Sequence, residues 1–147
     1  MKAEDFIQYY FEDLKIGAFA SLQKTITEAD AYSFAEISMD TNPVHLNEKF
    51  ARRTKFESRI AHGMISASLF SGIFGTKMPG PGSILVTQTL RYRRPVRFGD
   101  TVTATVTIKG MVSRTKLITF DTSCSVRGKV VISGEATVMA PPRRSSS

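Results

Sequence analysis

Cysteine is almost absent from this chain, since Cys124 is the only one among its 147 residues. One thiol cannot form an intramolecular disulfide, so nothing in the composition points to an oxidising compartment. Cys124 lies in a stretch of alternating apolar residues, which predicts a buried and unreactive thiol.

Long apolar runs are missing as well. The longest uncharged stretch that could form a helix, residues 63–76, is shorter than the roughly 20 residues that a membrane-spanning helix needs. The first residues mix acidic and aromatic side chains, so they resemble neither a secretory signal peptide nor an arginine-rich transit peptide. We therefore expect a cytoplasmic protein that does not enter a membrane.

The length of the chain suits one domain, because single domains usually hold about 100–200 residues. We expect this domain to span residues 1–140. The terminal PPRRSSS, residues 141–147, has the composition of a disordered tail.

The net charge of +7 indicates a surface that can attract nucleic acid, an anionic membrane or a phosphorylated small molecule. The basic residues form no stripe with interleaved aromatic side chains and no nucleic-acid motif, which argues against a nucleic-acid partner. Their densest group is Arg91, Arg93 and Arg94. This group predicts either a solvated strand edge or a docking site for phosphate.

Helical signals fill the first half of the chain. Thr27 can cap a helix that ends near Ser38, and a shorter helix is predicted over residues 48–53, after the capping residue Asn47. Residues 63–76 carry apolar side chains on every side of a helical wheel, which predicts a buried helix.

The second half of the chain alternates with a period of two. Four runs of alternating residues are separated by short turns and predict an antiparallel meander; they cover residues 84–92, 102–108, 118–126 and 132–138. A helix followed by such a sheet predicts an α+β fold, with the curved sheet wrapped around the helix. Because so small a sheet cannot cover the helix completely, we also expect a symmetric homodimer.

The stretch DTNPVH, residues 40–45, holds one of only two histidines. An aspartate and a histidine on a stiff loop can hold a water molecule and move a proton near neutral pH. Taken alone, Asp40 and His45 are better explained by a turn, because Asn42-Pro43 is an ordinary turn sequence.

The stretch IAHGM leads directly into the predicted buried helix. A helix start offers unpaired N–H groups that stabilise an oxyanion, and Gly63 permits close approach of a ligand to the backbone. His62 is better explained as a histidine that bonds a local backbone group, and Ser71 as a hydroxyl bonded back to Ala67. The helix holds no acidic residue, so acid–base groups must come from elsewhere.

Six segments together resemble the MaoC-like hydratases, specifically the short, single-hotdog (R)-specific enoyl-CoA hydratases. The resembling segments are YFEDLKIG at 10–17, DTNPVH at 40–45, IAHGM at 60–64, ASLFSG at 67–72, PGPGS at 79–83 and PVRFGD at 95–100. Members often carry aspartate two residues after the histidine, where this chain has Asn47. Both residues cap helices well, so we interpret the departure as structural.

The resemblance implies a hotdog fold, in which a long central helix is wrapped by a curved antiparallel sheet, usually in a homodimer. It implies a hydro-lyase that reversibly converts trans-2-enoyl-CoA to (R)-3-hydroxyacyl-CoA without a metal or redox cofactor. Asp40 and His45 match the catalytic pair of the family. Gly63 matches its oxyanion donor, Ser71 a supporting serine and Asn42 a signature asparagine that we expect to brace the loop. Arg91, Arg93, Arg94 or Arg59 would then be available to meet the phosphates of coenzyme A, and the sequence does not choose among them.

Other interpretations remain open on the sequence. A dehydratase that acts on 3-hydroxyacyl groups of acyl carrier protein runs the same reaction backwards, and an acidic carrier would suit a basic protein. A hotdog thioesterase commonly places a carboxylate on the central helix, which this chain lacks. The product could serve storage-polymer (polyhydroxyalkanoate) supply, β-oxidation or fatty acid synthesis.

Overall fold

A computed structural model describes residues 6–143 of the chain. Its elements, in order, are a 3-10 helix η1 (Phe11–Asp13), strand β1 (Phe19–Thr25), helices α1 (Glu28–Ser38), α2 (Pro43–Leu46), α3 (Glu48–Ala51) and α4 (Gly63–Thr76), and strands β2 (Ile84–Tyr92), β3 (Thr101–Val112), β4 (Leu117–Val126) and β5 (Lys129–Met139). Among the described residues, none of the helices combines the length and the apolar character that a membrane crossing requires.

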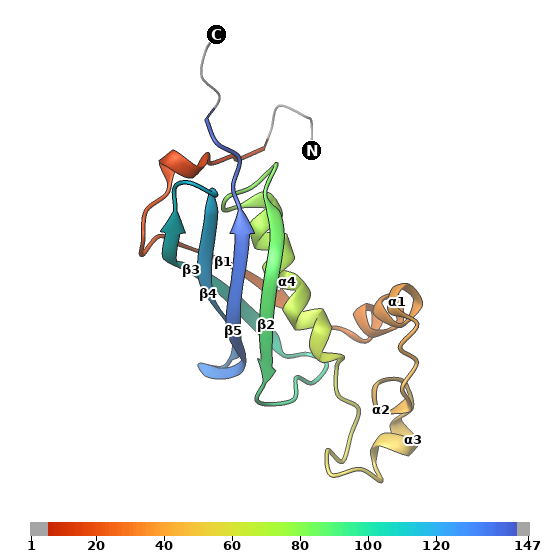
Figure 1. Ribbon diagram of the computed structural model, residues 1–147. Helices are drawn as coiled ribbons and strands as arrows, with labels where there is room; N and C mark the ends of the chain where they lie inside the picture. Colours follow the sequence, from red (N-terminus) through yellow and green to blue (C-terminus); the bar gives the residue numbers. More distant parts are fainter. Residues whose placement is uncertain (1–5, 144–147) are drawn as a thin grey trace.

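The five strands form one antiparallel sheet in the order β1-β3-β4-β5-β2 (Figure 1). All four predicted strands are present, but the predicted simple meander is wrong. Only β3, β4 and β5 follow one another as neighbours, while β2 pairs with β5 at the far edge. The sequence prediction also missed β1, which pairs with β3 at the opposite edge.

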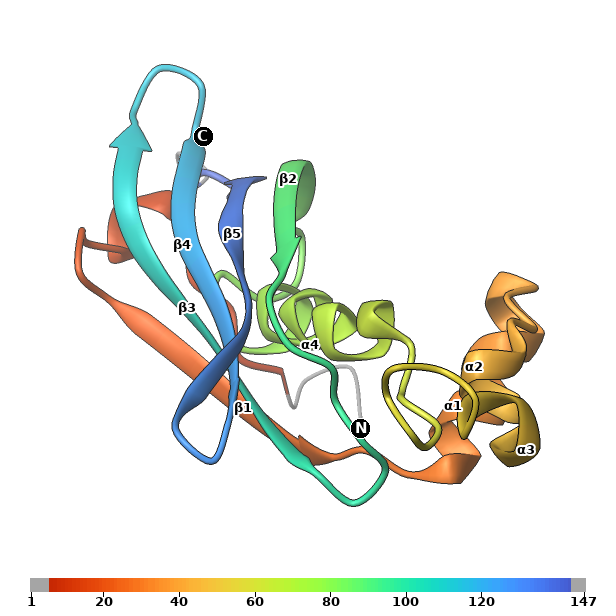
Figure 2. The same cartoon turned by 90° about the horizontal axis from the view of Figure 1, so that it is seen from below.

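The core lies between α4 and the concave face of the sheet. Every second residue of β3 is buried from Val102 to Ile108, as alternation predicts, and Phe74 of α4 packs on Phe120 of β4 with ring centroids 4.9 Å apart. Figure 2 shows the strands curving around α4. The predicted burial of Cys124 is confirmed, and this burial raises the pKa of its thiol to about 12.

Helix α4 has the predicted bounds, yet one side of it is open to solvent within a single chain. Phe70 and Ile73 are fully buried, whereas Met64, Ser68 and Ser71 form an exposed line at helical spacing. The prediction of a helix buried on every side is therefore wrong for one chain alone, although the α+β architecture with a central helix is confirmed.

Helices α1, α2 and α3 form an arm that stands beside the start of α4, away from the sheet (Figures 1 and 2). Thr27 caps α1 as predicted, because its hydroxyl accepts a hydrogen bond from the Asp30 N–H at 3.2 Å. The helix ends at Ser38, as predicted, and the next residue, Met39, turns the chain sharply with a left-handed φ of 66°. The predicted short helix after Asn47 is present but ends at Ala51.

The predicted disordered tail falls partly outside the described residues. Residues 144–147 are outside them. Before that point, the carbonyl of Pro141 accepts a hydrogen bond from the Phe11 N–H at 3.0 Å, and Arg143 pairs with Asp13.

Candidate active site

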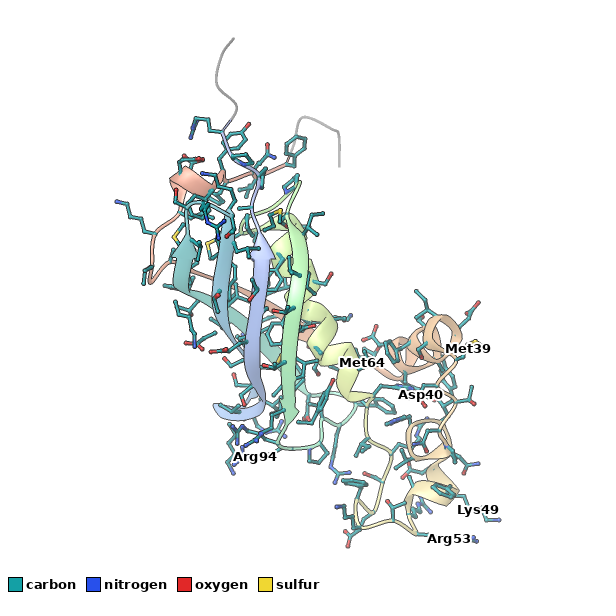
Figure 3. The ribbon with its side chains drawn as sticks, in the orientation of Figure 1. Met39, Asp40, Lys49, Arg53, Met64 and Arg94 are labelled. Atoms are coloured by element: carbon teal, nitrogen blue, oxygen red, sulfur yellow. The ribbon has the colours of Figure 1, made fainter. Side chains whose placement is uncertain are left out.

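The loop that follows α1 positions Asp40 through its own backbone bonds. One carboxylate oxygen of Asp40 accepts a hydrogen bond from the Asn42 N–H at 3.1 Å. The side chain of Asn42 in turn caps α2, accepting from the Val44 N–H at 3.0 Å. Figure 3 shows Asp40 between the arm and the start of α4, where Met64 is labelled. A loop closed by these bonds holds the carboxylate at the mouth of the central helix.

His45 lies one turn further on, in α2, and is buried. Its Nδ1 lies 2.8 Å from the carbonyl oxygen of Ile60. A carbonyl only accepts hydrogen bonds, so Nδ1 carries the proton and Nε2 of the neutral ring has a free lone pair. Burial lowers the pKa of His45 from its ordinary 6.5, and nearby His62 lowers it further, while the bond to Ile60 and the charge of Asp40 oppose these effects. The ring is therefore a neutral base near pH 7.

The second histidine, His62, lies against the first. The two imidazole rings stack with centroids 3.9 Å apart and 29° between their planes. Nε2 of His62 lies 3.0 Å from the backbone oxygen of Asp40 and 4.0 Å from its carboxylate. The expected backbone bond is present, but its acceptor is 22 residues away and not local. His62 thus joins the loop of Asp40 to the ring of His45.

The three side chains form a compact titratable cluster. The nearest ligand atoms of Asp40, His45 and His62 all lie within 4.8 Å of one another. Two acceptors at that spacing can share one water molecule, since each hydrogen bond to it spans about 2.8 Å. The same atoms are also types that could bind a divalent cation.

Gly63, the first residue of α4, brings the backbone into this cluster. Its N–H has no partner within the helix, because the first four N–H groups of any helix lack one. A Cβ at this position would lie 2.6 Å from the ring of Tyr92, so glycine lets this ring lie directly against the start of α4. Burial raises the pKa of Tyr92, which keeps its phenol protonated and able to donate.

A pocket of about 370 Å³ opens beside these groups. It is lined by His45, Lys55, Phe56, Ile60, Ala61, Gly63, Ser66, Tyr92, Arg93, Arg94, Pro95, Val96 and Ile132. The imidazole of His45 and the start of α4 therefore share one pocket with three cationic side chains, those of Lys55, Arg93 and Arg94. The hydroxyl of Ser66 is fully buried and has no hydrogen-bond partner within residues 6–143.

Of the predicted site residues, His45 and Gly63 line the pocket. Asp40 belongs to the cluster with His45 and His62 but, like Asn42, does not line the pocket. Arg93 and Arg94 line the pocket, but Arg91 is exposed and does not line it. Ser71 lies about two turns along α4 from Gly63, on its exposed side, and its hydroxyl makes no bond to Ala67 among the described residues. In this helix the back-bonds are instead made by Ser68 and Thr76.

Sequence reasoning missed the positions of Lys55, Ser66 and Tyr92 and the stacking of His62 on His45. A signal existed for His62 alone, because it directly precedes the glycine that begins the helix. The others reach the pocket from separate elements, so only the tertiary fold brings them together.

Known proteins resemble this chain over most of its length. A family profile described as "MaoC like domain" matches residues 17–130. A protein of Rhodospirillum rubrum named "(R)-specific enoyl-CoA hydratase" is 59% identical over 143 residues, covering 97% of this chain and 99% of that protein. A "3-hydroxybutyryl-CoA dehydratase" of Methylorubrum extorquens is 45% identical, over 91% of this chain and 85% of the relative.

Solved structures give the same result for the fold. The (R)-hydratase of Aeromonas caviae, described as involved in PHA biosynthesis, superimposes with a TM-score of 0.86 at 40% identity. The match covers 88% of this chain and 99% of that one. The fold is therefore the single hotdog, as the sequence predicts.

Proposed function

Because the chain belongs to the MaoC-like domain family, we propose that it is an (R)-specific enoyl-CoA hydratase. It would add water reversibly to trans-2-enoyl-CoA and give (R)-3-hydroxyacyl-CoA. The observation that carries the proposal is the imidazole of His45, whose Nε2 keeps a free lone pair, in one cluster with the carboxylate of Asp40 and beside the start of α4 at Gly63. A base, a second acceptor and an oxyanion donor are the groups that hydration of an enoyl thioester requires.

In the proposed reaction, Asp40 and His45 share one water molecule. The carboxylate accepts a hydrogen bond from one proton of the water, and Nε2 of His45 takes the other as the oxygen attacks C3 of the substrate. Electrons of the double bond move toward the thioester, whose oxygen becomes negative. Nε2 then delivers its proton to C2 on the same face, so addition is syn and all atoms are accounted for.

The N–H of Gly63 would receive the negative thioester oxygen. An oxyanion donor of this kind is worth about 10²–10³ in rate, and general acid–base help about 10²–10⁴. Asn42 contributes indirectly, because its N–H bonds the carboxylate of Asp40 and its side chain caps α2.

Coenzyme A is the carrier that we propose, since both relatives described above are named for CoA substrates. Arg93 and Arg94 lie in the pocket wall and can meet its phosphates. A 3-hydroxyacyl-[acyl carrier protein] dehydratase is the alternative, because the reaction centre is the same for both carriers.

We also propose a homodimer that completes the site. Three consecutive residues of β2, Ile84, Leu85 and Val86, are 45–60% exposed, so neither face of this edge strand is covered within one chain. Met39 and Met64 are exposed beside Asp40 as well. Exposed apolar side chains in such groups mark an interface, and a partner on this side would also cover Ser71 and enclose an acyl chain along α4.

The proposed steps move only protons and a hydroxyl, so they balance without a redox cofactor, and the absence of a metal remains a prediction. It is checked by treating the enzyme with a chelator, after which we expect unchanged turnover. The cytoplasmic location also remains a prediction.

The direct test is hydration of crotonyl-CoA, followed by loss of the enoyl absorbance. A dehydrogenase specific for the (R)-product then reads the configuration. We expect turnover to the (R)-product that Asp40→Asn abolishes. An (S)-product, or turnover by the wild type that survives Asp40→Asn, would contradict the proposed site, and activity on carrier-protein substrates alone would favour the alternative.

A further inference from the structure

A second hollow of about 370 Å³ adjoins the active-site pocket. It lies between the β2–β3 connection and the β4–β5 turn, and it is lined by Arg94, Pro95, Arg97, Asp100, Val126, Arg127, Lys129 and Val131. We call it the basic hollow. Arg94 and Pro95 belong to both walls, so the two spaces meet at these residues. Figure 3 shows Arg94 at the end of β2, next to the β4–β5 turn.

The charge of the basic hollow is unbalanced. Four of its residues are cationic, and Asp100 is its only acid. Asp100 pairs with Arg127 at 3.1 Å and also accepts a hydrogen bond from the Arg97 N–H at 2.9 Å. Within residues 6–143, Arg94, Arg97 and Lys129 form no ion pair. Cations that face one another across a concave wall repel, and an anion bound between them removes that cost.

Neutral acceptors hold two of these guanidinium groups in place. Arg94 donates to the carbonyl of Val130 at 2.5 Å. Arg97 donates to the carbonyl of Phe56 at 2.8 Å and to the hydroxyl of Ser58. Such bonds orient a guanidinium without cancelling its charge, so the remaining N–H groups stay available for a phosphate.

We propose that the basic hollow binds the phosphate groups of the coenzyme A carrier while the thioester reacts in the active-site pocket. This inference rests on the proposed function, because it assigns the distal half of that substrate. The pantetheine arm would cross from His45 and Gly63 past the shared Arg94. Arg127 and Lys129, together with Arg97, are then substrate-binding residues beyond those of the proposed catalytic pair.

The shape of the basic hollow favours a nucleotide over a carrier protein. Its four cationic residues are exposed to solvent but border one concave hollow that adjoins the active-site pocket. A compact phosphate group in such a hollow can accept two hydrogen bonds from one arginine.

The test compares crotonyl-CoA with crotonyl-pantetheine, which carries the same thioester and no nucleotide. For the wild type, kcat/KM should be much higher with crotonyl-CoA. The double variant Arg127→Ala/Lys129→Ala should lower the ratio of the two kcat/KM values about five- to twentyfold, mainly through KM for crotonyl-CoA. The side chain of Arg127 is 78% exposed, so its removal leaves the core intact.

Arg114→Ala is the matched control, because it removes an exposed arginine from the turn at the other end of β4. It should leave the ratio unchanged. Inhibition of the wild type by adenosine 3′,5′-bisphosphate, weakened in the double variant, provides a readout that requires no turnover of the truncated substrate.

The outcomes separate this inference from the proposed function. Hydration of neither substrate by the wild type would refute the proposed function and this inference with it. Hydration of both substrates with a ratio that Arg127→Ala/Lys129→Ala does not change would overturn the basic hollow alone. A loss confined to crotonyl-[acyl carrier protein], with crotonyl-CoA unaffected, would overturn it in favour of a protein-docking surface.

Discussion

The sheet and the arm differ in what holds them together. Along β3, alternate side chains from Val102 to Ile108 are buried against α4. In the segment from Met39 to Ala51, which carries the proposed catalytic pair, only His45 and Ala51 are buried. The sheet is stabilised by apolar burial, whereas the arm is held by caps and hydrogen bonds. This difference implies that polar changes in the arm reduce activity far more than stability, and that apolar changes in the core do the reverse.

The largest expected effect comes from the proposed catalytic pair. Asp40→Asn and His45→Gln should each lower kcat for crotonyl-CoA about 10²–10⁴-fold, because each removes a group that handles the attacking water. Asp40 has an exposed side chain, so the midpoint of thermal unfolding of Asp40→Asn should stay within about 2 °C of the wild type. Steady-state kinetics and calorimetry check both parts.

Asn47→Asp is the control for this pair, since aspartate caps a helix as well as asparagine does. It should retain nearly full activity. If Asp40→Asn hydrated crotonyl-CoA at a rate comparable to that of Asn47→Asp, the carboxylate of Asp40 would have a structural role only. The conclusion that polar changes in the arm reduce activity more than stability would then be wrong.

The next effect concerns stability and comes from the sheet. Phe120→Ala should lower the free energy of unfolding by about 3–5 kcal/mol, because Phe120 is fully buried against Phe74. Phe50→Ala, in the arm, removes the same ring from a residue that is 46% exposed and should cost less than about 1.5 kcal/mol. Urea unfolding of both variants measures the difference. Equal losses would show that the arm is packed as tightly as the core.

The same contrast explains which parts of the fold could be predicted from the sequence. Strands β3, β4 and β5 were predicted because alternation reports burial on one face, which is a local property. The sequence of β2 alternates as well, although neither of its faces is covered within one chain. The place of β2 beside β5 was not predicted, because periodicity does not say which strand is the neighbour. Strand β1 was missed because one of its inward residues is the small Ala20 and its exposed residues include Phe19, so its alternation is weak.

For the site, the sequence predicted the parts that lie within one motif. The turn at Asn42 and the glycine at the start of α4 follow from local rules for caps and helix ends. The stacking of His62 on His45 joins two motifs through the packing of the arm, and no local rule encodes it. The same holds for Lys55 and Arg127, which reach the pocket and the basic hollow from separate loops.

A smaller effect is expected where the arm and the sheet meet. A methyl group at Gly63 would lie 2.6 Å from the ring of Tyr92, so Gly63→Ala must displace either the ring or the start of α4. Such displacement should lower kcat/KM about 10–100-fold, since a shift of about 1 Å in an active site can cost 10²-fold. The double variant Gly63→Ala/Tyr92→Ala removes the clash. Recovery of activity in a double-mutant cycle would assign the loss to this contact, and further loss would assign it to the backbone of Gly63 itself.

The smallest expected effect is on pH dependence, and it tests the burial of His45 within the mostly exposed segment from Met39 to Ala51. Because burial lowers the pKa of His45 from 6.5, kcat/KM should be constant above pH 6.5 and fall only as the pH drops through that lowered value. His62→Gln removes a neighbouring imidazole that lowers the pKa of His45, so the acid limb should move up toward pH 6.5. A limb unchanged in His62→Gln would mean that burial alone sets the pKa.

Stability should follow the same titration. Below pH 6.5 the unfolded chain binds a proton at His45 before the folded chain does, so unfolding becomes easier as the pH falls from 6.5 through the lowered pKa. Above pH 6.5 both states are neutral at this residue and the contribution is fully present. Urea midpoints of wild type and His45→Gln, compared between pH 7.5 and pH 5.5, isolate it: the wild type should lose more stability on acidification than the variant. If the wild type and His45→Gln lost the same amount of stability on acidification, His45 would have the same pKa in the folded and unfolded chains. Burial in the arm would then not lower that pKa.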